Sequence, residues 1–374
     1  MKVEPAPGPL NLLLRGPDVP KLLERRLRAR GRPMISSGSL RPALESGTML
    51  SRRHVLASAL GLLGGSVVGV RAADKIPRLG VLFVGARSDP EVKRVTDAFV
   101  QGLQEAGYAD GRVHIEYRWA AGDRARLRDL AIDLVRHNVD VIVALSAPTA
   151  DASKRATQTI PIVMVATDPV ALGFTSNMAR PAGNITGLSM MGVELVAKQL
   201  ELLKETSPKI SRVGILGNRA NPGNASQFRQ AQAAARSLGV GLQYYEASDG
   251  SEVDKALTAM SRDHAEALLV LADPVLTSHR ERIARLSAQS RLPTMGGIRS
   301  LAEAGGLMTY SANYFDLCRR AAVYVDKILK GANPADLPIE QAATFELVIN
   351  LKTAKALGLT IPQSILVRAD QIIQ

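Results

Sequence analysis

Short apolar runs alternate with longer amphipathic stretches along most of the chain, beginning at about residue 78. The runs 78–84, 140–145 and 160–166 are almost continuously apolar, which is typical of strands that are buried on both faces of a parallel sheet. Between the first two runs, apolar residues recur every three or four positions over 89–106, and this spacing predicts a helix that ends at Gly107. Strands that alternate with helices in this way predict a parallel sheet with helices on both faces.

The same order of elements begins a second time at Arg212. The run 212–217 repeats the apolar pattern of 78–83, and a helix predicted over 224–237 ends at Gly239. Two copies of one pattern predict an α/β protein with two lobes, each a doubly wound parallel sheet. In such sheets ligands bind at the carboxyl ends of the strands, so the two lobes are expected to close on a solute in the cleft between them.

The positive charge of the chain is unevenly distributed. The 374 residues carry a net charge of +12, yet residues 1–48 account for +5 and residues 49–72 for +3, which leaves +4 for the remaining 302 residues. Most of the basic excess therefore lies outside the predicted lobes, and aromatic residues make up only 4% of the chain. Both observations argue against a nucleic-acid partner, because such a partner calls for basic and stacking residues on the folded part.

Residues 49–72 have the layout of a secretory signal peptide. A basic pair, Arg52 and Arg53, precedes an apolar stretch over 55–70 that is too short and too rich in glycine for a membrane span. The alternative for this stretch is an N-terminal helix packed on the protein. The basic pair also resembles the twin-arginine export motif, so the general secretory route and the twin-arginine route both stay open. Residues 1–48 show no sustained period and are interpreted as a disordered or mis-annotated leader.

The chain from about residue 75 to its end contains motifs of a known family of binding proteins. The longer motifs are Gly-Arg-Val-His-Ile-Glu-Tyr-Arg-Trp at 111–119, Ala-Arg-Pro-Ala-Gly-Asn-Ile-Thr-Gly-Leu at 179–188, and Phe-Glu-Leu-Val-Ile-Asn-Leu-Lys-Thr-Ala-Lys-Ala-Leu-Gly-Leu-Thr-Ile-Pro at 345–362. The shorter ones stand at 139–143, 159–163 and 168–170. On these motifs the chain resembles ABC-transporter substrate-binding proteins of the type I periplasmic-binding class, close to the tryptophan- and phenylalanine-binding receptors.

The resemblance implies a lobe organisation and a function. Lobe one would comprise 74–190 and 311–333, and lobe two would comprise 191–310 and 334–374, with the third crossing between the lobes near residue 334. The protein is expected to be a monomeric periplasmic receptor that captures a small amino-acid-like solute and delivers it to an inner-membrane ABC permease. No cofactor is expected. The alternative is a sensory protein that presents the solute to a membrane signalling partner.

The predicted strand ends of the first lobe supply candidate ligand contacts. Arg87 and Ser88 follow the first strand, while Ser146, Pro148 and Thr149 follow the third strand at the start of a helix. Backbone N–H groups and the positive end of a helix favour a carboxylate there, and Ser146 and Thr149 would add hydroxyl groups. The alternative is that Ser146 only caps the helix.

Further polar residues at strand ends are candidates for contacts with the rest of the solute. Asp168 follows the fourth strand and would pair with a ligand ammonium group, unless it serves only as a helix cap or turn residue. In the second lobe the corresponding candidates are Asn218, Asn221 and Asp273. Tyr310 ends a predicted strand next to the second crossing and would be an aromatic residue of the cleft.

Gly296 marks a departure from the resembled receptors, which often have a tyrosine at this position. Gly296 and Gly297 together offer no side chain. The missing aromatic wall is expected to enlarge the pocket or to change its ligand.

The sequence has no motif that points to an enzyme. It contains neither Gly-x-Ser-x-Gly nor Gly-x-x-x-x-Gly-Lys, and no Gly-x-Gly-x-x-Gly follows either leading strand. The five histidines lack metal-ligand spacing, and the single cysteine, Cys318, is expected to be a small core residue. A transcription regulator would need a DNA-binding pair of helices at the N-terminus, where 49–72 offers an export signal instead.

Overall fold

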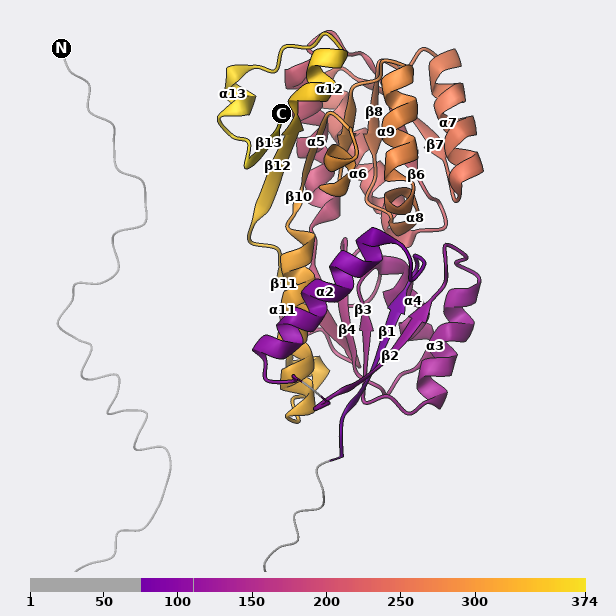
Figure 1. The fold of residues 1–374 in the computed structure, drawn as a ribbon, viewed down its shortest axis with the longest axis vertical. Helices are drawn as coiled ribbons and strands as arrows, with labels where there is room; N and C mark the ends of the chain where they lie inside the picture. The colour runs from indigo at the N-terminus through magenta and orange to yellow at the C-terminus, as the bar shows by residue number, and fades with distance from the viewer. Residues whose placement is uncertain (1–74, 110) are drawn as a thin grey trace, which may run out of the picture. The chain divides into compact units, whose positions relative to one another are not determined.

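The computed structural model describes residues 75–109 and 111–374. In this part of the chain the strands form a six-stranded and a seven-stranded sheet, each flanked by helices, so the predicted pair of α/β lobes is confirmed (Figure 1). The leader predicted for 1–48 and the signal peptide predicted for 49–72 lie outside the described residues. Within the described ranges, no helix combines the length and the apolar character that a membrane span requires.

The six-stranded sheet belongs to lobe one and has the order β11-β5-β4-β3-β1-β2. All of its neighbouring strands run parallel. Its strands are β1 (Arg78–Phe83), β2 (His114–Trp119), β3 (Val141–Ala144), β4 (Ile162–Ala166), β5 (Ile185–Ser189) and β11 (Glu340–Gln341). The helices of this lobe are α2 (Pro90–Glu105), α3 (Arg126–Arg136), α4 (Ala147–Ala156) and α11 (Tyr314–Leu329), with the short 3-10 helix η1 (Pro334–Asp336).

The seven-stranded sheet belongs to lobe two and has the order β13-β12-β10-β9-β8-β6-β7. Its strands are β6 (Arg212–Gly217), β7 (Gly241–Glu246), β8 (Ala267–Val270), β9 (Thr294–Gly296), β10 (Met308–Ala312), β12 (Phe345–Asn350) and β13 (Gln371–Ile373). Its helices are α5 (Gly192–Thr206), α6 (Pro222–Leu238), α7 (Gly250–Arg262), α8 (Pro274–Ser278), α9 (Arg280–Gln289), α10 (Ser300–Glu303), α12 (Leu351–Ala356) and α13 (Gln363–Leu366). The pairing of β10 with β12 is antiparallel, which the purely parallel prediction did not include.

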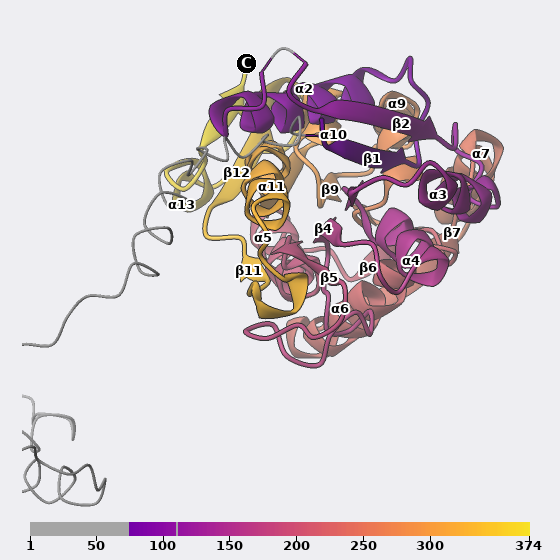
Figure 2. The ribbon, with the colours of Figure 1, turned by 90° about the horizontal axis from the view of Figure 1, so that it is seen from below.

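Each sheet has one hydrophobic core on each of its faces. In lobe one, α2 and α11 pack together over one face (Figure 2). Phe99 and the single cysteine, Cys318, are fully buried there. The prediction that Cys318 is a core residue is thus confirmed. Helices α3 and α4 cover the other face, with Leu134 at its centre. In lobe two, α5 and α6 cover one face and α7 and α9 the other.

The chain crosses from lobe one to lobe two for the last time later than predicted. The expected crossing lay near residue 334, but β11 still pairs with β5 in the first sheet and β12 is the first strand in the second. Two hydrogen bonds hold the intervening segment to lobe one: Thr186 Oγ1 donates to the Leu337 carbonyl at 2.7 Å, and Tyr324 Oη donates to the Pro338 carbonyl at 2.8 Å. The crossing therefore falls at about 342–344.

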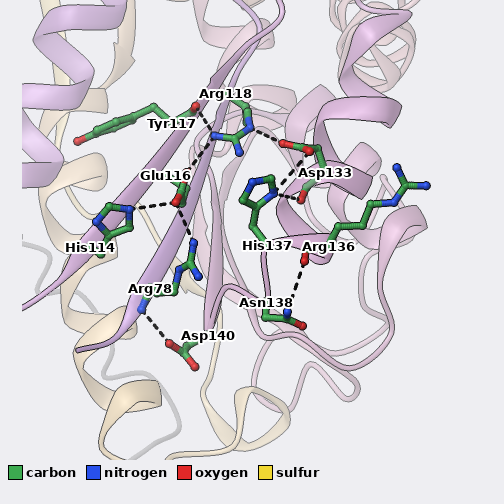
Figure 3. A network of polar contacts seen from close by, with 10 residues as sticks. All are labelled: Arg78, His114, Glu116, Tyr117, Arg118, Asp133, Arg136, His137, Asn138 and Asp140. Carbon is green, nitrogen blue, oxygen red and sulfur yellow. Dashed lines mark hydrogen bonds and ion pairs between the residues drawn. The ribbon is translucent and has the colours of Figure 1, made fainter. Parts of the chain in front are cut away.

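A polar network ties β1, β2 and α3 together on the surface of lobe one (Figure 3). Glu116 on β2 accepts hydrogen bonds from Arg78 at 3.0 Å and from Arg118 at 3.2 Å. Arg118 also donates to Asp133 on α3 at 2.6 Å. His114 lies 3.0 Å from Glu116, so this histidine has a structural partner on its own strand.

Candidate functional site

A cavity of about 80 Å³ lies between the two lobes, at the carboxyl ends of strands from both sheets. Lobe one contributes the segments that follow β1, β3 and β4, together with the first turns of α2 and α11. Lobe two contributes Asn221, the segment 272–274, and residues of α8. The wall is mostly apolar, and its larger apolar or aromatic members are Phe83, Val92, Val95, Leu145, Met190, Ile298 and Tyr314.

The helices that begin at the cavity share one kind of N-terminus, in which a capping side chain is closely followed by a proline. The caps are Asp89 for α2, Ser146 for α4, Asn221 for α6 and Asp273 for α8. Each cap accepts a hydrogen bond from the first turn of its helix, and the proline removes one further donor, because proline has no N–H. These helix ends therefore keep few donors for a ligand.

Ser146 and Thr149 show this most clearly, because they form a capping box. The Ser146 N–H donates to Thr149 Oγ1 at 3.1 Å, and the Thr149 N–H donates to Ser146 Oγ at 3.4 Å. Pro148 has no N–H, so among the first residues of α4 only the N–H of Ala147 lacks a partner in the described part of the chain. Ser146 caps α4 and also lines the cavity, so its position is compatible with both predicted roles.

Asp273 is the most buried carboxylate of the cavity wall, with 1% of its surface exposed. Its Oδ1 accepts from the N–H groups of Val275 at 2.8 Å and Leu276 at 3.0 Å, and its Oδ2 accepts from Asn221 Nδ2 at 2.8 Å. Burial raises the pKa of Asp273 above the ordinary value, and these hydrogen bonds oppose the rise. Both oxygens are thus engaged within the protein.

Glu91 and Thr167 are polar residues of the cavity that no pattern in the sequence singles out. Glu91 Oε1 and Thr167 Oγ1 are buried and have no hydrogen-bond partner among the described residues. The two residues are 6% and 4% exposed. Burial raises the pKa of Glu91. In the sequence, Glu91 looks like an ordinary acidic residue in the first turn of a helix, where the helix dipole favours it, so no pattern distinguished it.

Contacts across the cleft join the two lobes. Ser278 Oγ of lobe two donates to Asp89 Oδ2 of lobe one at 2.6 Å. Arg94 on α2 forms an ion pair with Glu303 on α10 at 2.8 Å. A Cβ atom added to Gly223 on α6 would come within 2.5 Å of Thr167 Oγ1, so the lobes are in direct contact there.

The structure brings three of the predicted ligand residues to the cavity, namely Ser146, Asn221 and Asp273. The other predicted residues do not line it: they are Arg87, Ser88, Pro148, Thr149, Asp168, Asn218, Gly296 and Tyr310. Pro148 and Thr149 are buried in the first turn of α4. Of the first turn of α4, Ala147 lines the cavity, whereas Pro148 and Thr149 do not.

Arg87 and Ser88 correct the expectation for the loop after β1. Both side chains are exposed, and the Arg87 guanidinium lies 5.5 Å from the centre of the Trp119 ring. After Gly85 the loop leads to Asp89, whose side chain accepts from the Glu91 N–H and caps α2. The wall at this position is formed by Gly85 and Asp89 instead.

Asp168 and Asn218 serve the backbone of their own turns. Asp168 Oδ1 accepts from the N–H groups of Val170 and Ala171, both at 3.0 Å. Asn218 Oδ1 accepts from the N–H of Ala220 at 3.0 Å, and the residue is fully buried. The turn role that was the alternative for Asp168 is thus the one the structure shows.

Gly296 and Tyr310 face the interior of lobe two rather than the cavity. A Cβ atom on Gly296 would lie 2.5 Å from Leu301 Cδ2, so the missing side chain makes room for α10 and does not enlarge the pocket. The Tyr310 ring centre lies 6.2 Å from that of Phe345, within the second sheet. Two aromatic residues do line the cavity, Phe83 and Tyr314, and the Tyr314 hydroxyl donates to the Leu145 carbonyl.

Two α/β lobes that meet at the carboxyl ends of their strands, with a cavity between them, define a solute-binding protein of the type I periplasmic-binding class. The sequence profile of the family described as ABC transporter substrate binding protein matches residues 84–373. The chain therefore belongs to the ABC transporter substrate-binding protein family, whose members are binding proteins rather than enzymes.

Similar proteins support this assignment. A tyrosine-binding protein of Clostridioides difficile (strain R20291) is 27% identical over 272 residues, which cover 72% of this chain and 78% of the relative. The crystal structure of a conserved domain protein from Vibrio cholerae is 29% identical, with a TM-score of 0.75 over 80% of this chain and 100% of that chain. An ABC domain from Streptococcus pneumoniae in complex with L-Trp is 28% identical, with a TM-score of 0.74 over 79% and 99% of the two chains.

Proposed function

We propose that this protein is a receptor that closes its two lobes on an amino-acid-like solute and delivers the solute to an ABC importer. The observation that carries the proposal is the cavity at the facing strand ends, which is apolar over most of its wall and has a few convergent polar groups. Such a cavity suits a solute with an apolar body and one polar end. The tyrosine-binding relative and the L-Trp complex point to the same kind of solute.

Delivery to a permease is proposed on the family assignment. Substrate-binding proteins of this family typically work in the periplasm or outside the cell, and residues 49–72 would direct export by the general secretory or the twin-arginine route. We expect a single chain to be the working unit, because the cavity is built from the two lobes of one chain. A sensory role, in which the liganded receptor engages a membrane signalling partner, is the competing proposal.

Binding is tested with the purified protein and a panel of L-amino acids in a thermal-shift assay. A solute that binds only the folded state stabilises it by RT ln(1 + [L]/Kd), so a ligand at about a hundred times its Kd raises stability by roughly 2.7 kcal/mol. We expect L-tyrosine, L-tryptophan or another amino acid with an apolar side chain to raise the melting temperature. A complete panel without any shift contradicts the receptor proposal.

Transport is tested by uptake of the radiolabelled solute that the thermal-shift assay identifies. Deletion of the gene is expected to abolish high-affinity uptake, and a copy that encodes the intact chain is expected to restore it. Uptake that is unchanged by the deletion contradicts delivery and favours the sensory alternative.

A further inference from the structure

The cavity wall contains one carboxylate oxygen, Glu91 Oε1, that has no hydrogen bond among the described residues, although the Ser300 hydroxyl lies near this carboxylate and opposes the rise of its pKa. Asp89 and Asp273, the other two acidic residues of the wall, use both of their oxygens within the protein. Glu91 Oε1 has no partner among the described residues, although the side chain is buried. A buried carboxylate oxygen without a partner is costly, so a folded protein that keeps one at a cavity wall is expected to use it for a ligand.

The cations near Glu91 do not neutralise it fully. Arg94 Nη1 lies 3.4 Å from Glu91 Oε2, but the same nitrogen lies closer to Glu303, at 2.8 Å. Arg280 approaches Asp89 at 3.7 Å, and its Nη1 donates to a backbone carbonyl. Each arginine therefore also binds a group other than Glu91. As a result, the negative charge of the Glu91 carboxylate is only partly balanced by the arginines.

The cavity has little to offer a carboxylate. None of the residues that line it is a lysine, an arginine or a histidine. The helix ends that could bind an anion are already capped, and two of the caps, Asp89 and Asp273, are themselves acidic. The N–H of Ala147 and the hydroxyl of Ser146 are the donors that remain on α4. Outside the wall, the guanidinium of Arg124 interacts with Asp273, and its buried Nη1 has no hydrogen-bond partner among the described residues. At the wall itself, a negative group on the solute meets few donors and three acidic side chains.

We infer that a protonated amine of the solute binds Glu91 Oε1, and that this amine, rather than a carboxylate, is the main polar element that the receptor recognises. The inference rests on the proposed function, because it concerns the same cavity. The ligand class is a primary amine with an apolar body, to which a carboxylate adds less.

The test compares three probes of one shape: L-tryptophan, tryptamine, which lacks the carboxylate, and indole-3-propionate, which lacks the amine. The corresponding L-tyrosine, tyramine and 3-(4-hydroxyphenyl)propionate are measured in parallel by isothermal titration calorimetry. Removal of the amine is expected to weaken binding about ten- to a hundredfold, as for a lost charge-assisted hydrogen bond, and removal of the carboxylate is expected to weaken it less. The reverse order overturns the inference.

The variant Glu91→Gln removes the charge and keeps the shape. It is expected to weaken binding of the amine-bearing probes about tenfold or more and to leave the melting temperature of the free protein unchanged or raised. Glu105→Gln, at the other end of α2 where Glu105 pairs with Arg319, is the matched control and should bind normally. Equal affinities of Glu91→Gln and wild type for the amines overturn the inference.

The two proposals fail in different ways. If none of the six probes and no amino acid of the panel binds wild-type protein, the proposed function fails. If an amino acid binds but Glu91→Gln and the amine-free analogue bind equally well, the function stands and the inference fails.

The pH dependence of binding gives an independent readout. The charged and titratable groups that face Glu91 are Arg94 on α2, Arg280 on α9, Glu303 on α10, and Tyr314 and Cys318 on α11, and the Ser300 hydroxyl of α10 lies near its carboxylate. Burial outweighs the arginines and raises the pKa of Glu91, so the carboxylate takes up a proton as the pH falls through that raised value. The affinity of the wild-type protein for tryptamine should therefore fall as the pH is lowered, and the affinity of Glu91→Gln should depend less on pH. Parallel profiles in the two proteins count against the inference.

Discussion

At the residue scale, the cleft is built from side chains that stabilise the fold and face the solute at the same time. Asp273 caps α8, holds Asn221, and still lines the cavity. Because its oxygens already accept three hydrogen bonds, it shapes the cavity more than it attracts a ligand. Ser146 has the same double position on α4.

The double role of Asp273 predicts a combined loss. Asp273→Ala removes the cap of α8 and leaves Asn221 Nδ2 without its carboxylate partner, so the free energy of unfolding should fall by about 1–2 kcal/mol. The loosened wall should also weaken ligand binding. Asp249→Ala removes the cap of α7, which does not line the cavity, and should lower stability without changing affinity. Urea denaturation and calorimetry measure the two effects; unchanged affinity in Asp273→Ala would show that this residue only caps the helix.

The site could be predicted from the sequence only in part, for reasons that the residues make plain. Residues directly after buried strands, such as Ser146 and Asp273, were found because strand ends are recognisable. Glu91 was missed because its burial depends on α10 and α11, which are more than 200 residues away in the sequence. Arg87 is exposed and does not line the cavity. The sequence could not show this, because it does not reveal which way a loop turns after its strand.

At the element scale, the strands and helices followed from periodicity, whereas their close contacts depend on individual small residues. Gly102 lies in the last turn of α2, where glycine favours the helix less than alanine does. A Cβ atom there would lie 2.1 Å from the Arg319 carbonyl oxygen of α11. Gly102 thus sets the distance between two helices that cover the same face of the first sheet.

Gly102→Ala should therefore destabilise the protein, although alanine has a higher helix propensity than glycine. In an open helix the change would stabilise by about 1 kcal/mol, but here the clash with α11 should lower the free energy of unfolding by roughly 1–3 kcal/mol. Fluorescence of Trp119, the single tryptophan, reports urea unfolding of lobe one. Gln101→Ala, the neighbouring exposed position, should stay within about 0.5 kcal/mol of wild type. A more stable Gly102→Ala protein would contradict the close packing of α2 on α11.

The pairing of β1 with β2 predicts a pH-dependent contribution to stability. Hydrogen bonds from Arg78 and His114 lower the pKa of Glu116 from 4.5 to about 2. A carboxylate whose pKa is lowered by folding stabilises the folded state at pH values above its ordinary pKa. This contribution is lost as the pH falls from the ordinary pKa toward the lowered pKa. Glu116→Gln should thus be less stable than wild type near neutral pH, and the difference should shrink between pH 4.5 and about 2.

Urea denaturation at a series of pH values checks this expectation. Glu281→Gln, on an exposed position of α9, serves as the control and should follow wild type throughout. A difference between Glu116→Gln and wild type that does not change with pH would mean that the network of Figure 3 contributes by packing rather than by charge.

At the scale of the whole molecule, ligand affinity depends on how readily the two lobes close. The segments near 190, 312 and 343 connect the lobes, and the cavity wall is complete only when residues of both lobes meet. Apparent affinity falls in proportion to the fraction of molecules in the binding-competent state. A change that holds the lobes apart should therefore weaken binding even if it leaves every ligand contact in place.

Gly223→Val tests this coupling, because Gly223 does not line the cavity but meets Thr167 across the cleft. Even a Cβ atom at this position would lie 2.5 Å from Thr167 Oγ1, so the valine side chain should act as a wedge. We expect ligand affinity to fall roughly tenfold or more and the radius of gyration from small-angle X-ray scattering to stay large when ligand is added. Ala225→Val, an exposed position two residues further along α6, places the same side chain outside the cleft and should bind as wild type does. If Gly223→Val binds as tightly as Ala225→Val, contact between Thr167 and α6 is not required for binding. Lobe closure must then be controlled by the other contacts across the cleft, which are the ion pair of Arg94 with Glu303 and the hydrogen bond from Ser278 to Asp89.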